Sequence, residues 1–516
     1  MDEPSIPAGA ARTRHMDTGT TEPRAGLREW AGLAVLAIAV MMITFDMFVL
    51  LLALPGLTAD LHPTAVEQLW IIDVYGFLVA GFLITMGTLG DRIGRRKLLM
   101  IGAACFAIAS LLSAFATSPA MLIGARALLG VAGSTLAPST LALVSTMFRN
   151  PTQMGVAVGI WAGGFTVGAI LGPIVGGLLL AHFWWGSVFL IGVPIMAVLI
   201  VLSAVLVPEF KDPDAGRIDI ASVVTSLVAM LALVYALKEL ARHGWQPLPL
   251  VVGVAGLALW TLFVRRQRKL AEPLLDVGLF AGRSFSAMLF GLSLYGLVGA
   301  SSMLFITQFL QSVADLTPID TALCLLPGMV AGTASATLSP LLGRRVRPAY
   351  LIGGGVLGVA AVFGWFTQLD PGSSPTVLIV GFALMGLFEG PLISLGTNLV
   401  ISGAPPEKAG SAASMAQVAN EAGGALGIAI MGSIGAAVYL NELATTTVHA
   451  PAAAQENIAS AVAAATTLPP TAADALLAVA RSAYVDGMTV FAGVSAGVLV
   501  VAAVFIVAVL RHVPRA

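Results

Sequence analysis

The stretch Gly87–Lys97, GTLGDRIGRRK, is a dense charged turn between two apolar runs, each long enough to cross a bilayer. Its arginines, lysine and aspartate are too costly to bury in hydrocarbon, so the turn must face water where two membrane spans end. Its glycines permit a tight change of direction there. A water-facing hinge with this charge pattern, held between two spans, indicates a membrane transporter.

The composition places the whole chain in a membrane. It has 516 residues, of which 58% are apolar and only 10% are charged, and its mean hydropathy is +0.94. A soluble domain carries roughly a quarter charged residues, so this chain cannot fold as a water-soluble globule. The formal net charge of −1 gives no overall basic field, which argues against nucleic acid as a partner.

Apolar runs of membrane-spanning length predict an all-α polytopic protein with fourteen transmembrane helices. The expected spans are 30–54, 70–90, 98–117, 120–147, 154–180, 185–207, 218–240, 248–264, 284–311, 319–343, 348–368, 376–403, 409–440 and 487–511. With a cytoplasmic N-terminus, the arginines and lysines at 92–97, 265–269 and 344–347 all face the cytoplasm, as the positive-inside rule requires. On this threading Lys238, Arg242 and Arg481 face outside, and the even number of spans returns the C-terminus to the cytoplasm.

An internal repeat supports this organisation. The segment GRRVRP at Gly343–Pro348 matches the first charged turn but lacks its aspartate. We therefore expect a disordered cytoplasmic tail at 1–29, a six-helix bundle at 30–207, two inserted helices with linkers at 208–283, and a second bundle at 284–516. Transporters built from two such halves bind substrate near the midplane between them. The alanine-rich segment 441–486, on the outer face, is expected to be a helical hairpin or a loosely ordered loop.

Four carboxylates lie where lipid should be: Asp46, Asp73, Glu389 and Glu421. Each costs ~2.5–3.5 kcal/mol at a helix centre, so four would be an improbable accident. A carboxylate anion is disfavoured in apolar surroundings, so such a group can carry a proton in one state and an organic cation in another. For each acid taken alone, a hydrogen bond that only packs helices together is the alternative.

Two further spans carry distinctive patterns. Arg126 lies in LIGARALLGVAG, within the fourth span, and a buried arginine needs a partner there. The fifth span reads GGFTVGAILGPIVGG, in which glycines recur every fourth residue around Pro173. Such glycines allow close helix approach, and the proline removes a backbone hydrogen bond and kinks the helix. For Arg126, a purely structural ion pair is the alternative.

Aromatic side chains near these acids would suit flat lipophilic cations through cation–π and stacking contacts. As a set they are Phe45, Trp70, Tyr75, Trp161, Phe165, Phe305 and Phe388. Any one of them alone is more typical of a core or lipid-facing position.

The charged turn resembles the loop after the second span of major facilitator superfamily transporters. The resemblance implies a gate that biases two states of an alternating-access cycle, and the residues concerned are Gly87, Asp91, Arg92, Gly94, Arg95 and Arg96. The alternative is that these cations only set the topology. FDMFVLLLALP in the first span, with Trp70, Asp73 and Tyr75, resembles the fourteen-span drug:proton antiporter family of that superfamily, which includes QacA-type exporters.

This resemblance implies an MFS fold and roles for particular residues. In the family the acids that match Asp46 and Asp73 are linked to proton coupling and cation recognition, and the arginine that matches Arg126 to proton coupling. The motif matched by Gly168, Gly172, Pro173, Gly176 and Gly177 separates antiporters from symporters. The roles of Glu389 and Glu421 rest on their burial and not on a motif.

The sequence therefore predicts proton-coupled efflux of lipophilic, mostly cationic drugs, dyes and antiseptics across the cytoplasmic membrane. The expected partners are protons, lipophilic organic cations and membrane lipid, and the expected functional unit is a monomer. A dedicated exporter of one metabolite or antibiotic is the alternative. An enzyme or a receptor is disfavoured, because the histidines are scattered and no phosphate-binding loop is present. We expect no metal and no cofactor.

Overall fold

The computed structural model describes residues 25–211, 219–270, 273, 277–404, 409–445 and 452–513. Residues 1–24 of the expected tail lie outside the described residues. Every regular element within these ranges is helical, and the helices are α1 (Leu27–Leu61), α2 (Ala65–Ile93), α3 (Arg95–Ala114), α4 (Pro119–Met147), α5 (Pro151–His182), α6 (Ser187–Leu190), α7 (Gly192–Leu206), α8 (Ile220–His243), α9 (Pro247–Gln267), η1 (Val277–Ala281), α10 (Arg283–Gln308), η2 (Phe309–Val313), α11 (Pro318–Gly343), α12 (Pro348–Phe366), α13 (Pro375–Ser402), α14 (Ala409–Thr445), η4 (Ala452–Gln455), α15 (Ile458–Ala465) and α16 (Pro470–Leu510).

Fourteen of these segments are long and apolar enough to cross a membrane, with α6 and α7 together forming the sixth. The prediction of an all-α, fourteen-span protein is confirmed. Local signals start several of the helices. The Thr64 side chain accepts a hydrogen bond from the Glu67 amide, and the Glu67 carboxylate accepts one from the Thr64 amide, so the pair satisfies donors that the first turn of α2 leaves free. Pro119, Pro318 and Pro348 each occupy the first turn of a helix, where the missing N–H removes no bond.

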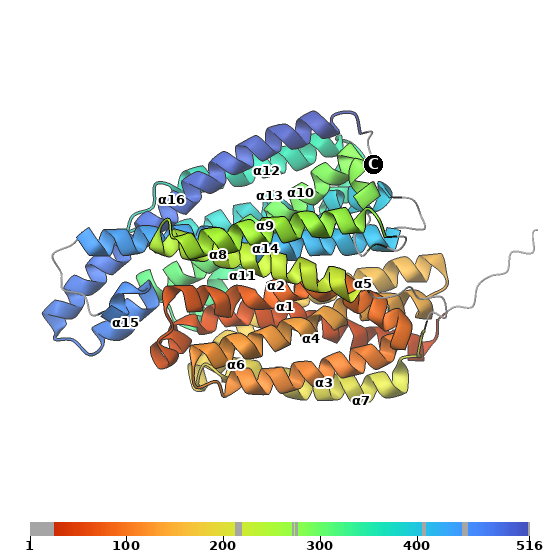
Figure 1. The fold of residues 1–516 in the computed structure, drawn as a ribbon, viewed down its shortest axis with the longest axis horizontal. Helices are drawn as coiled ribbons and strands as arrows, with labels where there is room; N and C mark the ends of the chain where they lie inside the picture. Colours follow the sequence, from red (N-terminus) through yellow and green to blue (C-terminus); the bar gives the residue numbers. More distant parts are fainter. Residues whose placement is uncertain are drawn as a thin grey trace, which may run out of the picture.

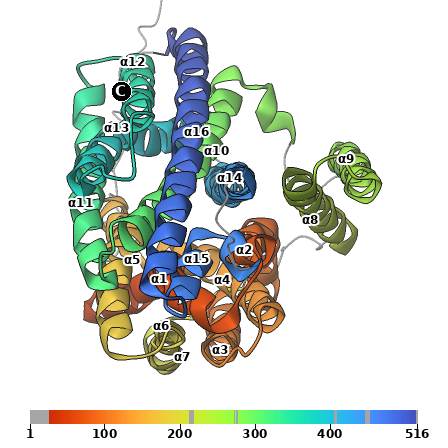
Figure 2. The same cartoon turned by 90° about the vertical axis from the view of Figure 1, so that its left-hand side faces the viewer.

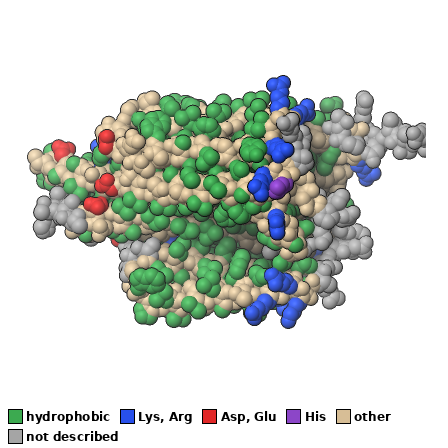
Figure 3. Space-filling model, turned by 90° about the horizontal axis from the view of Figure 1, so that it is seen from above, with side chains coloured by type: hydrophobic (Ala, Val, Ile, Leu, Met, Phe, Trp, Pro, Cys, Tyr) green, Lys and Arg blue, Asp and Glu red, His purple; other side chains and the backbone are tan. Residues whose placement is uncertain are grey.

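The spans form two bundles that lie side by side (Figure 1). One contains α1–α7 and the other α10–α16. On the face shown in Figure 3, exposed arginines and lysines gather at one end of the molecule, which we call the basic end. The residues concerned are Arg92, Lys97, Arg268, Lys269, Arg344, Arg345 and Arg347.

The bundles touch at the end opposite the basic end. A Cβ atom at Gly177 of α5 would lie 2.8 Å from the Cα of Ile319 of α11, so only a glycine lets these helices approach this closely. Gly432 of α14 faces the Leu69 side chain of α2 in the same way. The structure therefore shows the bundles in direct helix contact at this end.

The helices α8 and α9 lie to one side of both bundles (Figure 2). Helix α8 packs on α2 and α14, and α9 packs mainly on α8. Near the basic end, Arg266 donates hydrogen bonds of 2.8 and 2.9 Å to the Asp219 carboxylate. These bonds lower the pKa of Asp219 to about 2. An ion pair thus joins α8 and α9 to each other near the basic end.

The described part of 441–486 is helical. Helix α14 continues to Thr445, α16 begins at Pro470, and η4 and α15 lie between them; residues 446–451 lie outside the described residues. The Glu456 carboxylate accepts a hydrogen bond of 2.9 Å from the Ala65 amide, at the start of α2. Helix α15 also packs on α1. This segment therefore covers the end of the first bundle that lies opposite the basic end.

Candidate functional site

Asp46 of α1 and Arg126 of α4 form an ion pair inside the first bundle. Both side chains are almost completely buried, at 5% and 1% exposure. Arg126 also donates from Nε to the carbonyl oxygen of Ile71, on α2, at 3.2 Å. One guanidinium group therefore joins three helices, and its charge is compensated within the apolar interior.

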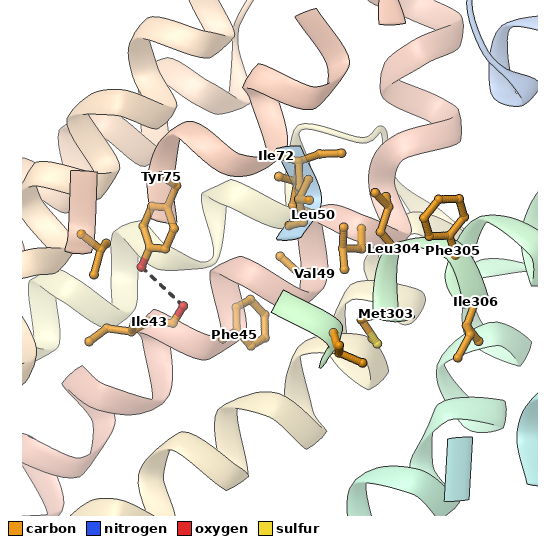
Figure 4. Close-up of a cluster of buried hydrophobic side chains, with 14 of the residues drawn as sticks. Ile43, Phe45, Val49, Leu50, Ile72, Tyr75, Met303, Leu304, Phe305 and Ile306 are labelled. Carbon is orange, nitrogen blue, oxygen red and sulfur yellow. Dashed lines mark hydrogen bonds between the residues drawn. The ribbon is translucent and has the colours of Figure 1, made fainter. Parts of the chain in front are cut away.

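Tyr75 of α2 completes the surroundings of this pair. Its ring centroid lies 4.7 Å from the Arg126 guanidinium carbon, within cation–π range. Its hydroxyl donates to the Ile43 carbonyl oxygen at 3.4 Å, a contact drawn in Figure 4. Phe45, beside Asp46, is 3% exposed and belongs to the same apolar cluster as Met303 of α10 (Figure 4). The pair is thus surrounded by α1, α2 and α4 and by Phe189 of α6, whose ring centroid lies 6.0 Å from the Arg126 guanidinium carbon, and the apolar cluster beside it reaches the second bundle.

The glycine stripe of α5 fixes the position of α1. A Cβ atom at Gly164 would lie 2.7 Å from the Ala37 carbonyl oxygen, and one at Gly172 would lie 3.2 Å from that of Phe45. Gly168 and Gly176 face Met41 and Val49 in the same register. Four glycines on one face of α5 therefore meet every fourth residue of α1, which holds the backbone beside Asp46 against its neighbour.

Asp73 of α2 lies apart from this pair and binds Lys238 of α8. The Lys238 nitrogen is 3.0 and 2.8 Å from the two carboxylate oxygens, and both side chains are fully buried. The same nitrogen lies 4.0 Å from the centroid of the Trp70 ring. The sequence places Lys238 on the outer side of the membrane, but the structure shows that its side chain is buried and not in water. Its place near the end of a span suggested an aqueous position, but the packing of α8 on α2 and α14 turns this residue inward.

Glu421 of α14 lies at the interface between the bundles. Its only hydrogen bond within the described part of the chain comes from Gln417, one turn earlier, at 2.9 Å. One turn later, Ala425 contacts Gly76 of α2. Tyr75 lies within electrostatic range of both the Asp46 and Glu421 carboxylates. The field of the tyrosine's surroundings thus includes one acid that is paired with a base and one acid that, among the described residues, has no cation beside it.

Glu389 of α13 lies inside the second bundle, away from the other acids. It lines a cavity of about 20 Å³ together with Tyr295, Phe388 and apolar side chains of α12 and α16. A volume of this size holds about one water molecule. Within the described chain no base lies beside this carboxyl. The four span acids therefore divide into two that are paired and two that are not.

The remaining aromatics are distributed over separate places. Trp161 donates from Nε1 to the Thr140 hydroxyl at 2.9 Å and meets the Phe165 ring edge-on at 5.4 Å. Phe305 stacks on Phe491 at 4.5 Å and lines a cavity of about 60 Å³ near the end opposite the basic end. The seven aromatics therefore do not line one common chamber in this structure.

The charged turn lies at the basic end and is bound within the first bundle. Arg95 contacts Asp91 at 2.6 Å and donates to the Pro138 carbonyl oxygen at 3.4 Å. Gly94 has a φ of 112°, which side chains rarely adopt, and a Cβ there would collide with Glu209.

Glu209, which follows the last helix of the first bundle, was not singled out from the sequence. Its carboxylate accepts hydrogen bonds from the Arg96 and Lys97 amides at 3.0 and 3.2 Å, and so caps α3. Arg96 itself donates to the Val207 carbonyl oxygen, at the end of α7, at 3.1 Å. Arg92 is exposed, and Gly87 faces Pro138 of α4. The turn thus ties α2 and α3 to α4 and α7.

Among the described residues, no cluster of three or more histidine, cysteine or acidic side chains is arranged to hold a metal ion.

Comparisons with known proteins agree with this architecture. The Major Facilitator Superfamily profile matches residues 36–428. The chain is 40% identical to the multidrug efflux pump LfrA of Mycolicibacterium smegmatis, over 94% of this chain and 97% of the relative. It is 34% identical to the methyl viologen resistance protein SmvA of Salmonella typhimurium, over 89% and 93%, and 32% identical to the tetracenomycin C resistance and export protein of Streptomyces glaucescens, over 97% and 94%.

Solved structures share the fold. A bacterial homologue of the human lysosomal transporter Spinster, crystallised in an inward-facing and unoccupied conformation, superposes with a TM-score of 0.68 at 16% identity and covers 94% of this chain and 98% of its own. Together with the fourteen spans and the two bundles, these matches show that this multi-pass membrane protein belongs to the multidrug exporters of the major facilitator superfamily.

Proposed function

We propose that this protein exports lipophilic organic cations from the cytoplasm in exchange for protons. The observation that carries the proposal is the contrast between Asp46, which is paired with Arg126 in a dry interior, and Glu421, which has no basic partner among the described residues and lies near the same tyrosine. A proton and an organic cation can each neutralise one carboxylate. Two such acids, one inside the first bundle and one at the interface between the bundles, can therefore supply the exchange that antiport requires.

The Asp46–Arg126 pair is the proposed proton-responsive element. When Asp46 takes up a proton, the Arg126 guanidinium loses its counter-ion inside a medium of low dielectric. The contact between α1 and α4 then weakens, which favours a different arrangement of the helices in the first bundle. Loss of the proton restores the pair, so proton binding biases one of two states.

Glu421 is the proposed acid for the cationic substrate. It lies on α14, the helix of the second bundle that packs on α2, and an organic cation there would have a carboxylate beside it and the Tyr75 ring within reach. Glu389 lies inside the second bundle next to Tyr295, and we assign it a supporting role in proton exchange. Asp73 is already neutralised by Lys238.

Sidedness follows from the positive-inside rule, because exposed arginines and lysines crowd the basic end. We therefore assign the basic end to the cytoplasm and the chain to the cytoplasmic membrane, with both termini inside. On this assignment the bundles touch at their outer ends, and the charged turn from Gly87 to Lys97 lies at the cytoplasmic gate. The proposed unit is a monomer surrounded by lipid.

The names of the relatives bear on the substrate. Methyl viologen, for which SmvA is named, carries two positive charges, which favours cations among the substrates. The protein named for tetracenomycin C export favours the second candidate, a dedicated exporter of one compound. A broad panel of cations and neutral antibiotics separates these two possibilities, since a dedicated exporter would move one compound only.

The direct test is ethidium efflux from cells that carry the protein, with and without an agent that collapses the proton gradient. Efflux should stop when the gradient is lost. If dye leaves equally fast without the gradient, the antiport mechanism is wrong. Cells with an empty vector give the background rate.

A further inference from the structure

Trp70 and Asp73 of α2 surround a single ammonium group, that of Lys238 on α8. The nitrogen lies 3.0 and 2.8 Å from the carboxylate oxygens and 4.0 Å from the centroid of the indole ring. A carboxylate and an aromatic face are groups with which proteins bind organic ammonium ions. These two residues thus have the composition of a cation-binding site, and a side chain of the same protein fills it.

We propose that Trp70 and Asp73 form a lateral binding site for lipophilic organic cations, and that Lys238 is its built-in occupant, which a bound cation displaces. This inference rests on the proposed export of such cations. It adds a second site, separate from the Asp46–Arg126 pair, on the side of the molecule where α8 lies (Figure 2).

The occupant sits on a helix that lies outside both bundles. Val234 of α8 packs with Phe77 of α2 and with Ala425 and Ala429 of α14 in one small apolar cluster. Helix α8 therefore bridges the seam where the two bundles meet, and it is held there by apolar packing together with the Lys238–Asp73 pair. Because α2 and α14 belong to different bundles, a change in their relative position must also change the packing of α8 against them.

A ligand dissolved in the membrane can approach the inserted helices that cover this seam. The outward side of α9 is strongly apolar and exposed, with Leu248, Val251 and Val254 each about two-thirds accessible. Such a surface faces lipid in a membrane protein. A lipophilic cation that partitions into the bilayer can therefore approach α8 and α9 without passing through water.

The buried carboxylate of Asp73 determines which ligands can replace Lys238. Asp73 is 1% exposed, and an unpaired carboxylate at such a depth is strongly disfavoured. Lys238 can leave only when another positive charge, a bound cation or a proton on Asp73, takes its place. The exchange of one monovalent cation for another conserves the local charge, whereas a neutral or anionic compound would leave Asp73 uncompensated. The tethered lysine thus makes the site selective for cations. A ligand must also bind tightly enough to displace this lysine.

Chemical labelling of the unaltered protein tests displacement. The full chain is placed in phosphatidylglycerol nanodiscs, whose headgroups carry no cation, and treated with a membrane-permeant amine-acylating reagent. Saturating tetraphenylphosphonium should raise the acylation of Lys238, measured by mass spectrometry, while the exposed Lys97 and Lys269 serve as controls and stay unchanged. Triphenylphosphine oxide, which is neutral, should have no effect. Bound tetraphenylphosphonium with no change at Lys238 would overturn the proposal.

Equilibrium binding to variants provides the second arm. Lys238→Met should bind tetraphenylphosphonium about tenfold more tightly than the natural chain, because the competitor is gone. Adding Asp73→Asn or Trp70→Leu to Lys238→Met should cancel this gain. Equal affinity in Lys238→Met and Lys238→Met/Asp73→Asn contradicts the proposal. Should Lys238→Met fail to accumulate, the labelling of the natural chain decides alone.

Neither measurement uses a proton gradient. A result against Lys238 displacement therefore leaves proton-coupled export untouched, whereas gradient-independent efflux would count against antiport and leave this binding site in place.

Discussion

Arg126 on α4 and Asp46 on α1 form a buried ion pair across 80 residues of sequence. The same guanidinium group donates to the Ile71 carbonyl oxygen of α2 and lies over the Tyr75 ring. Removing one partner of such a pair leaves a charge without compensation, a loss of about 3–5 kcal/mol, whereas removing both can be nearly neutral. The pair thus stabilises the packing of α1 on α4, and a single proton on Asp46 would remove much of that stabilisation.

Asp46→Asn should abolish dye efflux while the protein stays in the membrane at a normal level. The amide keeps a hydrogen-bond acceptor for Arg126, but it cannot take up and release a proton. The measurement is ethidium efflux together with the amount of protein in isolated membranes. Asp46→Asn/Arg126→Gln, which removes both charges, should be at least as stable as the single variant and equally inactive. Full transport by Asp46→Asn would exclude this acid from the mechanism.

Glu421→Gln should weaken the transport of cations and spare that of neutral compounds. Glutamine preserves the size of the side chain and a partner for Gln417, but it removes the negative charge. We expect the apparent KM for ethidium to rise about tenfold, equivalent to ~1.4 kcal/mol of binding. Asp486→Asn, at an exposed position on α16, is the matched control and should change nothing. An equal loss for charged and neutral substrates would point to a structural role.

Gly168→Ala should disrupt the packing of α1 on α5. A Cβ atom at this position would collide with the Met41 carbonyl oxygen and the Thr44 hydroxyl. Overpacking of this kind costs about 1–3 kcal/mol. Gly159→Ala lies on the same helix with open space around it, so it should be tolerated. Thermal stability in detergent checks both variants, and equal melting temperatures would refute the close contact.

Asp91→Asn should slow the transport cycle and leave substrate affinity near normal. The aspartate contacts Arg95 at 2.6 Å, at the basic end and away from the buried acids. Loss of this contact changes the balance between states and not the binding site. Initial efflux rates over a range of dye concentrations separate the maximal rate from KM. A large rise in KM with an unchanged maximal rate would contradict a gating role.

The sequence by itself determined the class of the protein and its spans. Burial in lipid leaves a direct mark on composition, and a helix satisfies its backbone hydrogen bonds locally, so fourteen apolar segments could be placed one at a time. The turn from Gly87 to Lys97 and the glycine stripe from Gly164 to Gly176 were equally visible, because each is a contiguous pattern. The residues of α1 that the stripe contacts, every fourth one from Ala37, could not be identified from the sequence.

Only the tertiary structure decided which charges meet. Lys238 and Asp73 are 165 residues apart, and their contact depends on how α8 is rotated against α2 and α14. Asp46 forms an ion pair with Arg126, whereas Glu389 lies beside a separate small cavity. Hydropathy records that a residue enters the membrane, but the direction in which its side chain points is set by packing between helices that are distant in sequence. For that reason the buried acids could be found from the sequence, and their division into paired and unpaired groups could not.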